Sequence, residues 1–172
     1  MRTRLTLAAL LLFFYLFSGC EKTTAFTIDT SLITSTDLAG NLIGSSDPTD
    51  WTQDANWSET EKALFRADLV DLTGMERANI QMSPAYPNPC SSQTTLLFTT
   101  SLPTKMRIVI TDDKANKLAS YALQTDAGLN AYVLPFNSSI FQIGKNYRVY
   151  YAFDAPGQLM YYFGHGDISL RN

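Results

Sequence analysis

The fold is decided by a run of short strands that begins with Thr94-Thr95-Leu96-Leu97-Phe98-Thr99-Thr100. This segment is β-branched and apolar, which is typical of a strand. The next segment, Lys105-Met106-Arg107-Ile108-Val109-Ile110-Thr111, alternates apolar and polar residues. Its period of two places Met106, Ile108 and Ile110 on one face. The two segments therefore predict consecutive strands, the second with its apolar residues on one face.

Further strands of this kind follow, separated by turn signals every eight to fourteen residues or so, a rhythm that is typical of a sandwich. After a polar turn at 112–117, the predicted strands are 118–123, 131–136, 147–153 and 159–163, with a continuation through Ile168 and Leu170. No helix-length segment interrupts them, which argues against parallel crossover units. The sequence thus predicts an all-β sandwich of six to seven antiparallel strands.

One short helix is predicted before the strands. Ser58-Glu59-Thr60-Glu61 matches a capping box, in which the Ser58 hydroxyl accepts the Glu61 amide and the Glu61 carboxylate accepts the Ser58 amide. Apolar residues then recur at helical spacing, and Gly74 suits a helix terminus. These apolar positions are Ala63, Leu64, Ala67 and Leu69 or Val70. The aromatic residues Trp51, Trp57 and Phe65 are candidates to pack the helix, and a ligand platform is the alternative role of the tryptophans.

The first twenty residues resemble a bacterial lipoprotein signal. Arg2 and Arg4 give a positive start, and 5–17 is an apolar run too short to cross a bilayer as a helix. The ending Leu16-Phe17-Ser18-Gly19-Cys20 resembles a lipobox. The resemblance implies cleavage before Cys20 and a diacylglycerol on its sulfur. An uncleaved anchor and an ordinary secretory signal are the alternatives.

Together, these predictions divide the chain into a signal peptide at 1–19, a tether at 20–46, a helix-containing segment at 47–81 and a sandwich at 82–172. Within the tether, Ala25-Phe26-Thr27-Ile28-Asp29 alternates and predicts a short strand. The chain has 13 basic and 16 acidic residues, which gives a formal net charge of −3. Removal of the signal also removes Arg2 and Arg4, so 11 basic residues remain and the formal net charge becomes −5. Nucleic acid is therefore not expected as a partner, because phosphate-driven binding needs clustered basic residues.

Four segments of the predicted sandwich carry a similarity to a known family: Ala85-Tyr86-Pro87-Asn88-Pro89-Cys90, 94–98, 108–112 and Gly144-Lys145-Asn146-Tyr147-Arg148-Val149-Tyr150. This similarity, over roughly 82–164, is to the immunoglobulin-like C-terminal domain of type IX secretion cargo in Bacteroidota. It implies an immunoglobulin-like sandwich. In that family the domain acts as a sorting signal and is removed after export.

Two departures from that family bear on the sorting role. The turn at 112–117 lacks the family's usual glycine, and the chain ends without a basic closing strand. Removal of the domain would also leave only residues 20–81, with one short helix and little core. We therefore expect the sandwich to be retained as the working body, with a sorting signal as the alternative.

Candidate catalytic and metal-binding groups are sparse. His165 is the only histidine, and its neighbours Gly164 and Gly166 predict a tight turn or bulge. The carboxylates of Asp47, Asp50 and Asp54 lack the alternation and glycine of an EF-hand, which favours turn and capping roles over calcium binding. Asp112 and Asp113 are adjacent in a turn, and adjacent strand residues point to opposite faces, so they do not indicate a pair of catalytic carboxylates. We expect no catalytic residues, no metal and no cofactor.

The two cysteines have different expected fates. Lipidation consumes Cys20 and leaves Cys90 as the only thiol, so no intramolecular disulfide is expected. We predict that Cys90 is a small buried residue. A nucleophile or an intermolecular bridge is the alternative, although no basic neighbour in the sequence suggests an activated thiolate.

Aromatic residues give the strongest binding signal. In 147–153, period two separates Tyr147, Val149, Tyr151 and Phe153 from Arg148 and Tyr150. If the first set faces the core, a candidate partner or glycan surface forms outside it. That surface consists of Arg148, Tyr150, Met160 and Tyr162. The alternative, which we favour, is that the N-terminal strand or the Trp51-to-Phe65 region covers this face.

These features predict a lipid-anchored, non-catalytic lipoprotein of the outer membrane. Its expected role is that of an accessory subunit of an outer-membrane barrel or secretion complex, attached to the membrane through Cys20. A surface glycan-binding or adhesive module is the alternative, motivated by the tyrosines, and an enzyme built on His165 ranks third. The membrane leaflet and the side that the protein faces do not follow from the sequence.

Overall fold

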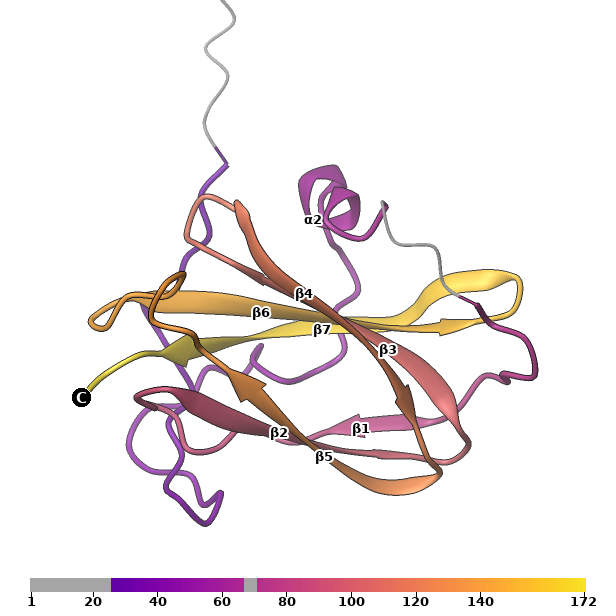
Figure 1. Cartoon of the computed structure of the whole chain (residues 1–172), viewed down its shortest axis with the longest axis horizontal. Helices are drawn as coiled ribbons and strands as arrows, with labels where there is room; N and C mark the ends of the chain where they lie inside the picture. The colour runs from indigo at the N-terminus through magenta and orange to yellow at the C-terminus, as the bar shows by residue number, and fades with distance from the viewer. Residues whose placement is uncertain (1–25, 67–70) are drawn as a thin grey trace, which may run out of the picture.

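The computed structural model describes residues 26–66 and 71–172, which form two antiparallel sheets packed face to face (Figure 1). One sheet has three strands in the order β1-β2-β5, and the other has four in the order β4-β3-β6-β7. The strands are β1 (Ile80–Met82), β2 (Gln93–Thr100), β3 (Thr104–Thr111), β4 (Lys117–Thr125), β5 (Gly128–Pro135), β6 (Asn146–Ala155) and β7 (Gln158–Ser169). The predicted all-β sandwich is confirmed.

The main core lies between the two sheets. Met106, Ile108 and Ile110 of β3 share one face, as their alternation predicts, and all three are fully buried. The opposite sheet contributes Leu96 and Phe98 of β2 to the same core. Period-two patterning therefore identified the buried face of these strands correctly.

β7 corrects one expectation from the sequence. Gly164 and Gly166 were predicted to mark a tight turn or bulge, but both lie inside the continuous strand Gln158–Ser169. A Cβ on Gly166 would lie 2.1 Å from Cε2 of Trp51, and a Cβ on Gly164 would lie 2.0 Å from the carbonyl oxygen of Thr52. The glycines are therefore needed for space, because the 50–52 segment packs directly on the strand backbone.

The predicted capping box is present. Ser58 caps α2 (Glu59–Ala63), its hydroxyl accepts the Glu61 amide, and the Glu61 carboxylate accepts the Ser58 amide. The helix has five residues, shorter than the apolar spacing predicted. The predicted helical positions Ala67, Leu69 and Val70 lie outside the described residues. Gly74, expected at the helix terminus, lies in a separate turn with φ of 73°.

The N-terminal part departs from the predicted tether. Residues 1–25, with the lipoprotein signal and Cys20, lie outside the described residues. In 26–46, however, Ile28, Thr34 and Thr36 are buried against the sandwich, and residues 26–29 do not form the predicted strand. The sandwich itself also begins before residue 82, because β1 starts at Ile80. Within 26–66 and 71–172, no helix has the length and hydrophobicity needed to span a membrane.

Candidate functional site

Parts of residues 26–66, here called the covering segment, lie on the outward face of the four-stranded sheet. Ile28, Trp57 and Phe65 of this segment form a second apolar cluster with Tyr150 of β6. The Trp57 ring lies 5.2 Å from the Tyr150 ring in an edge-on arrangement. Figure 1 shows α2 on the side of this sheet that faces away from the three-stranded sheet. This face is therefore a second core.

The candidate surface of Arg148, Tyr150, Met160 and Tyr162 does not form. Tyr150 is 0% exposed, so it cannot stack on a glycan or contact a partner in this structure. Tyr162 pairs with Phe153 across β6 and β7 and packs with Phe153 against the core between the sheets. Met160, by contrast, packs on the outer cluster. A positive φ of 50° at Met160 interrupts the alternation, so two residues predicted to share a face lie on different ones.

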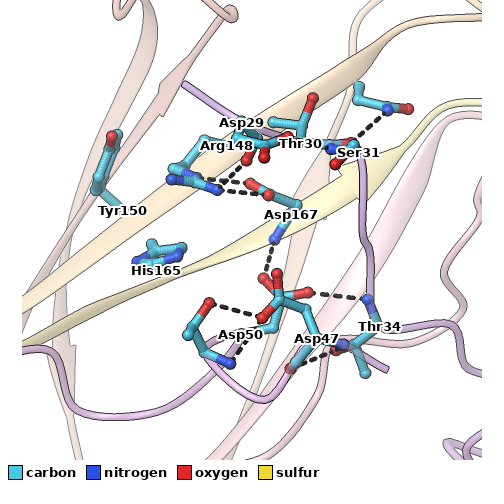
Figure 2. A network of polar contacts seen from close by, with 12 residues as sticks. Asp29, Thr30, Ser31, Thr34, Asp47, Asp50, Arg148, Tyr150, His165 and Asp167 are labelled. Carbon is cyan, nitrogen blue, oxygen red and sulfur yellow. Dashed lines mark hydrogen bonds and ion pairs between the residues drawn. The ribbon is translucent and has the colours of Figure 1, made fainter. Parts of the chain in front are cut away.

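Arg148, the fourth member, belongs to a polar network beneath the covering segment (Figure 2). Its Nε and Nη2 atoms donate to the two carboxylate oxygens of Asp167 at 2.8 and 2.7 Å. Nη2 also donates to the carbonyl oxygen of Asp29 at 2.7 Å. Such a two-point pair fixes the guanidinium in place. Arg148 therefore fastens the covering segment to β6 and β7.

Asp50 forms the next link of the network. Its carboxylate accepts the Thr34 amide and the Asp167 amide, both at 2.9 Å, and so joins two parts of the covering segment to β7. Burial, and to a lesser extent the negative charge of Asp167, raise the pKa of Asp50 to about 6. Both bonds need the oxygens as acceptors, so the carboxylate is engaged by the fold.

Asp54 holds the single histidine. Its Oδ2 lies 2.6 Å from Nδ1 of His165 and 3.1 Å from Nε1 of Trp57. The hydrogen bond with His165 is the main reason why the pKa of Asp54 is lowered, with a further contribution from the charge of His165. An ionised carboxylate only accepts, so Nδ1 carries the proton. This is the orienting half of a catalytic triad, but within the described residues the His165 ring makes no hydrogen bond to a hydroxyl or thiol.

A shallow pocket of about 350 Å³ opens above this network, lined by residues that include Asp29, Asp47, Arg148 and His165. The Asp47 carboxylate accepts the amide and the hydroxyl of Thr49 in a local turn, as predicted. The turn and capping roles predicted for Asp50 and Asp54 are wrong, because their carboxylates make long-range contacts to β7. Across 26–66 and 71–172, no group of three or more His, Cys, Asp or Glu side chains is placed to hold a metal ion. The charged groups here hold the covering segment in place.

Three further polar residues complete the attachment. Arg107 and Asp154, which are 2% and 0% exposed, form a two-point ion pair at 2.6 and 2.8 Å, and Arg107 Nη1 donates to the carbonyl oxygen of Phe65. The Asn88 amide group donates to the carbonyl oxygens of Thr34 and Asp167. Sequence reasoning missed these contacts because each joins residues at least 42 positions apart.

Cys90 is free and buried, as predicted. Burial raises the pKa of its thiol to about 11. The thiol is thus protonated near neutral pH and is a poor nucleophile in this structure. A larger surface pocket of about 670 Å³ lies beside it, between the 36–43 loop and the segment that contains Pro87 and Pro89.

The outward face of the three-stranded sheet is bare. Its central side chains are Leu97 and Thr99 of β2 and Leu129, Ala131 and Val133 of β5. Leu129 is 70% exposed and Val133 is 50% exposed. None of the three strands of this sheet contains an Asp, Glu, Lys or Arg residue. Within the described part of the chain, this face therefore combines exposed apolar side chains with an absence of charge on its three strands.

No protein-family model, curated protein or solved structure matches the chain.

Proposed function

We propose that this protein is a lipid-anchored, non-catalytic lipoprotein of the outer membrane that serves as an accessory subunit of a membrane barrel or secretion complex. The lipid on Cys20 holds it at the membrane. The outward face of the three-stranded sheet, centred on Leu97, Leu129 and Val133, contacts the partner. Both parts are needed, because the anchor sets the location and the face sets the partner.

The bare face is the observation that carries this proposal. Exposed apolar side chains grouped on one surface mark interaction sites in soluble proteins, and the cores of protein interfaces are depleted in charge. Leu129 and Val133 lie beside Leu97, and no charged side chain of the sheet separates them. A partner can bury this face without desolvating an ion.

The anchor is supported by the first twenty residues. Each buried methylene of an acyl chain contributes about 0.8 kcal/mol, so two or three chains on one cysteine attach a protein stably where one myristoyl chain does not. The covering segment begins close behind, with Phe26 only six positions after Cys20. An anchored sandwich therefore stays close to the bilayer and to the parts of a membrane partner that project from it.

Affinity purification from membranes tests the docking face. The full chain with a C-terminal tag is extracted in mild detergent, and a co-purifying integral membrane protein is identified by mass spectrometry. Thr99→Lys puts a charge on the bare face, whereas Ser120→Lys puts one at an exposed position of β4. We expect the partner to be lost with Thr99→Lys and kept with Ser120→Lys. Recovery of the parent chain without any other protein contradicts the proposal.

Metabolic labelling tests the anchor separately. Cells grown with labelled palmitate should incorporate the label into the parent chain and not into the Cys20→Ala variant. Equal labelling of the two chains, or none in either, removes the lipid anchor from the proposal whatever the purification shows.

A further inference from the structure

The four sheet edges of the sandwich are not equally protected. β1 is a three-residue edge strand, and β7 is covered because the Trp51 and Asp54 amides donate to its carbonyl oxygens. β4 has an irregular register with β3 near Lys117. Its exposed side chains are Lys117, Ser120, Ala122 and Gln124, which are short, polar or charged. Short strands, irregular pairing, charges and covering segments are the usual ways of blocking an edge.

β5 has no charge, irregular pairing or covering segment in the described part of the chain, and its one protected position is Pro135, its last residue, which lacks an amide donor. It runs for eight residues without a charge, and its pairing with β2 has an unbroken register from Gly128 to Pro135. Within 26–66 and 71–172, no strand pairs with its other side. Its exposed side chains Leu129, Ala131 and Val133 are all apolar. Long, regular and uncharged edges of this kind are templates for another strand.

At Leu129, Ala131 and Val133, the main-chain amide and carbonyl groups of β5 point away from β2, toward the unpaired edge of the sheet. Leu97 accepts the Ser83 amide, and Thr95 exchanges hydrogen bonds with Tyr86, so both use their main-chain groups on the side away from β5. In an antiparallel pair, residues opposite each other direct these groups either both inward or both outward. Ala131 lies opposite Leu97, and Val133 lies opposite Thr95. Ala131 and Val133 therefore direct their amides and carbonyls to the open edge.

We propose that β5 pairs with β5 of a second copy of this chain, in an antiparallel register centred on Ala131. This register places Ala131 opposite Ala131 and Leu129 opposite Val133, so apolar side chains meet on one face with the small residue at the centre. A two-fold interface brings each residue against the same surface of the other copy, and a charge near the axis would repel itself. β5 has no charge, and its outward-directed amides and carbonyls meet in this register.

The position of Phe26, six residues after Cys20 in the sequence, fits this arrangement, an argument that rests on the proposed function. The two-fold axis of an antiparallel strand pair is perpendicular to the sheet. Phe26, where the described chain begins, packs on the outward side of the four-stranded sheet, and Figure 1 shows this end on the side opposite β5. A two-fold rotation about this axis keeps the Phe26 ends of both copies on the same side of the paired sheets. Two lipids can therefore enter one membrane.

Membrane attachment also compensates for a small interface. One strand pair buries less surface than a stable soluble dimer needs. Confinement of both copies to one membrane raises their effective concentration, as a linker does for two binding modules. The pairing also joins the two bare faces into one six-stranded surface. The area of the proposed docking face is thereby doubled, and the covered face stays unchanged.

Cross-linking of the full chain in membranes tests the pairing. A short bis-maleimide is added to membranes that contain Ala131→Cys or the matched control Ala122→Cys, which is exposed on β4. Cys90 is buried, so the introduced thiol is the reactive one. We expect a covalent dimer with Ala131→Cys and none with Ala122→Cys. An absence of dimer with Ala131→Cys, or an adduct with a different protein there, overturns the proposal.

A second pair of variants tests the register. With Ala131 at the centre, Cys at position 129 of one copy lies opposite Cys at position 133 of the other. Two Cys at position 129 are instead offset by four residues, which is about 14 Å along the strands at about 3.4 Å per residue. Co-expression of Leu129→Cys and Val133→Cys should therefore give more dimer than either variant alone. Equal yields contradict this register. Palmitate labelling and partner recovery, measured on the same cells, report the proposed function independently of these yields.

Discussion

The outward faces of the two sheets differ in what they carry and in what covers them. The four-stranded sheet presents Arg107, Asp154, Arg148 and Asp167 outward, and the chain covers these groups with its own N-terminal part. The three-stranded sheet presents Leu97, Leu129 and Val133, and the described chain leaves Leu129 and Val133 exposed and Leu97 half-buried. The face that carries charged groups is thus the buried one, and the face without charge is the exposed one.

The two faces therefore have different roles: the covered face stabilises the fold, and we connect the bare face to binding. Buried ion pairs are costly to desolvate, yet a pair fixed by two-point contacts and extra hydrogen bonds specifies one arrangement of the groups it joins. Here Arg107 and Arg148 each bond to a carboxylate and to a carbonyl of the covering segment. The covered face holds that segment in one place. The bare face makes no comparable internal contact, so its exposure is what we connect to binding.

The largest predicted effect is on the covered face. Asp154→Asn leaves the Arg107 guanidinium buried with a neutral partner, and the loss of one member of a buried pair costs about 3–5 kcal/mol. Urea unfolding of the full chain should show this decrease. Asp113→Asn, at an exposed turn position, is the control and should stay within about 0.5 kcal/mol of the parent. A decrease below about 1 kcal/mol for Asp154→Asn would show that the covered face is loosely held.

The second prediction concerns pH. The pKa of Asp50 is raised from 3.8 to about 6, chiefly by burial, so the folded state binds the proton more tightly than the unfolded state. The contribution of Asp50 is therefore most favourable below pH 4 and is lost as the pH rises through 6, by up to about 3 kcal/mol. The unfolding free energy of the parent should therefore fall relative to that of Asp50→Asn as the pH rises from 4 to 7. Parallel curves would contradict the assigned pKa.

The third prediction tests the close packing on β7. Gly166→Ala brings a methyl group against the Trp51 ring, and overpacking of this kind costs about 1–3 kcal/mol. In a Trp51→Ala background the same change should cost much less, because the obstructing ring is gone. A double-mutant cycle of unfolding free energies measures the coupling. Additive effects would mean that the two residues do not meet.

The smallest effect on stability is predicted for the bare face. Val133→Thr keeps the β-branched shape at a half-exposed position, so the unfolding free energy should change by less than about 0.5 kcal/mol. Recovery of the membrane partner should nevertheless fall. A clear decrease in the unfolding free energy of Val133→Thr would instead show that Val133 stabilises the fold, and it would contradict the claim that the bare face serves binding and not stability.

Much of the sandwich follows from local patterns. The alternation in 105–111 identified the buried face of β3, and Ser58 with Glu61 identified the start of α2. The covered face does not follow in this way, because period two separates the faces of a strand without saying which segment covers them. Tyr162 shows the limit most clearly. Its face depends on the register with Phe153 and on the positive φ at Met160, neither of which is visible in the sequence.

Amide hydrogen exchange on the full chain tests the contrast between the two faces most directly. The Trp51 and Asp54 amides, bonded to β7, are compared with the Ala131 and Val133 amides, which face the open edge of β5. Exchange is measured in membranes and in dilute mild detergent. We predict slow exchange at Trp51 and Asp54 in both conditions, and slow exchange at Ala131 and Val133 only in membranes. Rapid exchange at Ala131 and Val133 in membranes would contradict the central claim that this edge is an interaction surface.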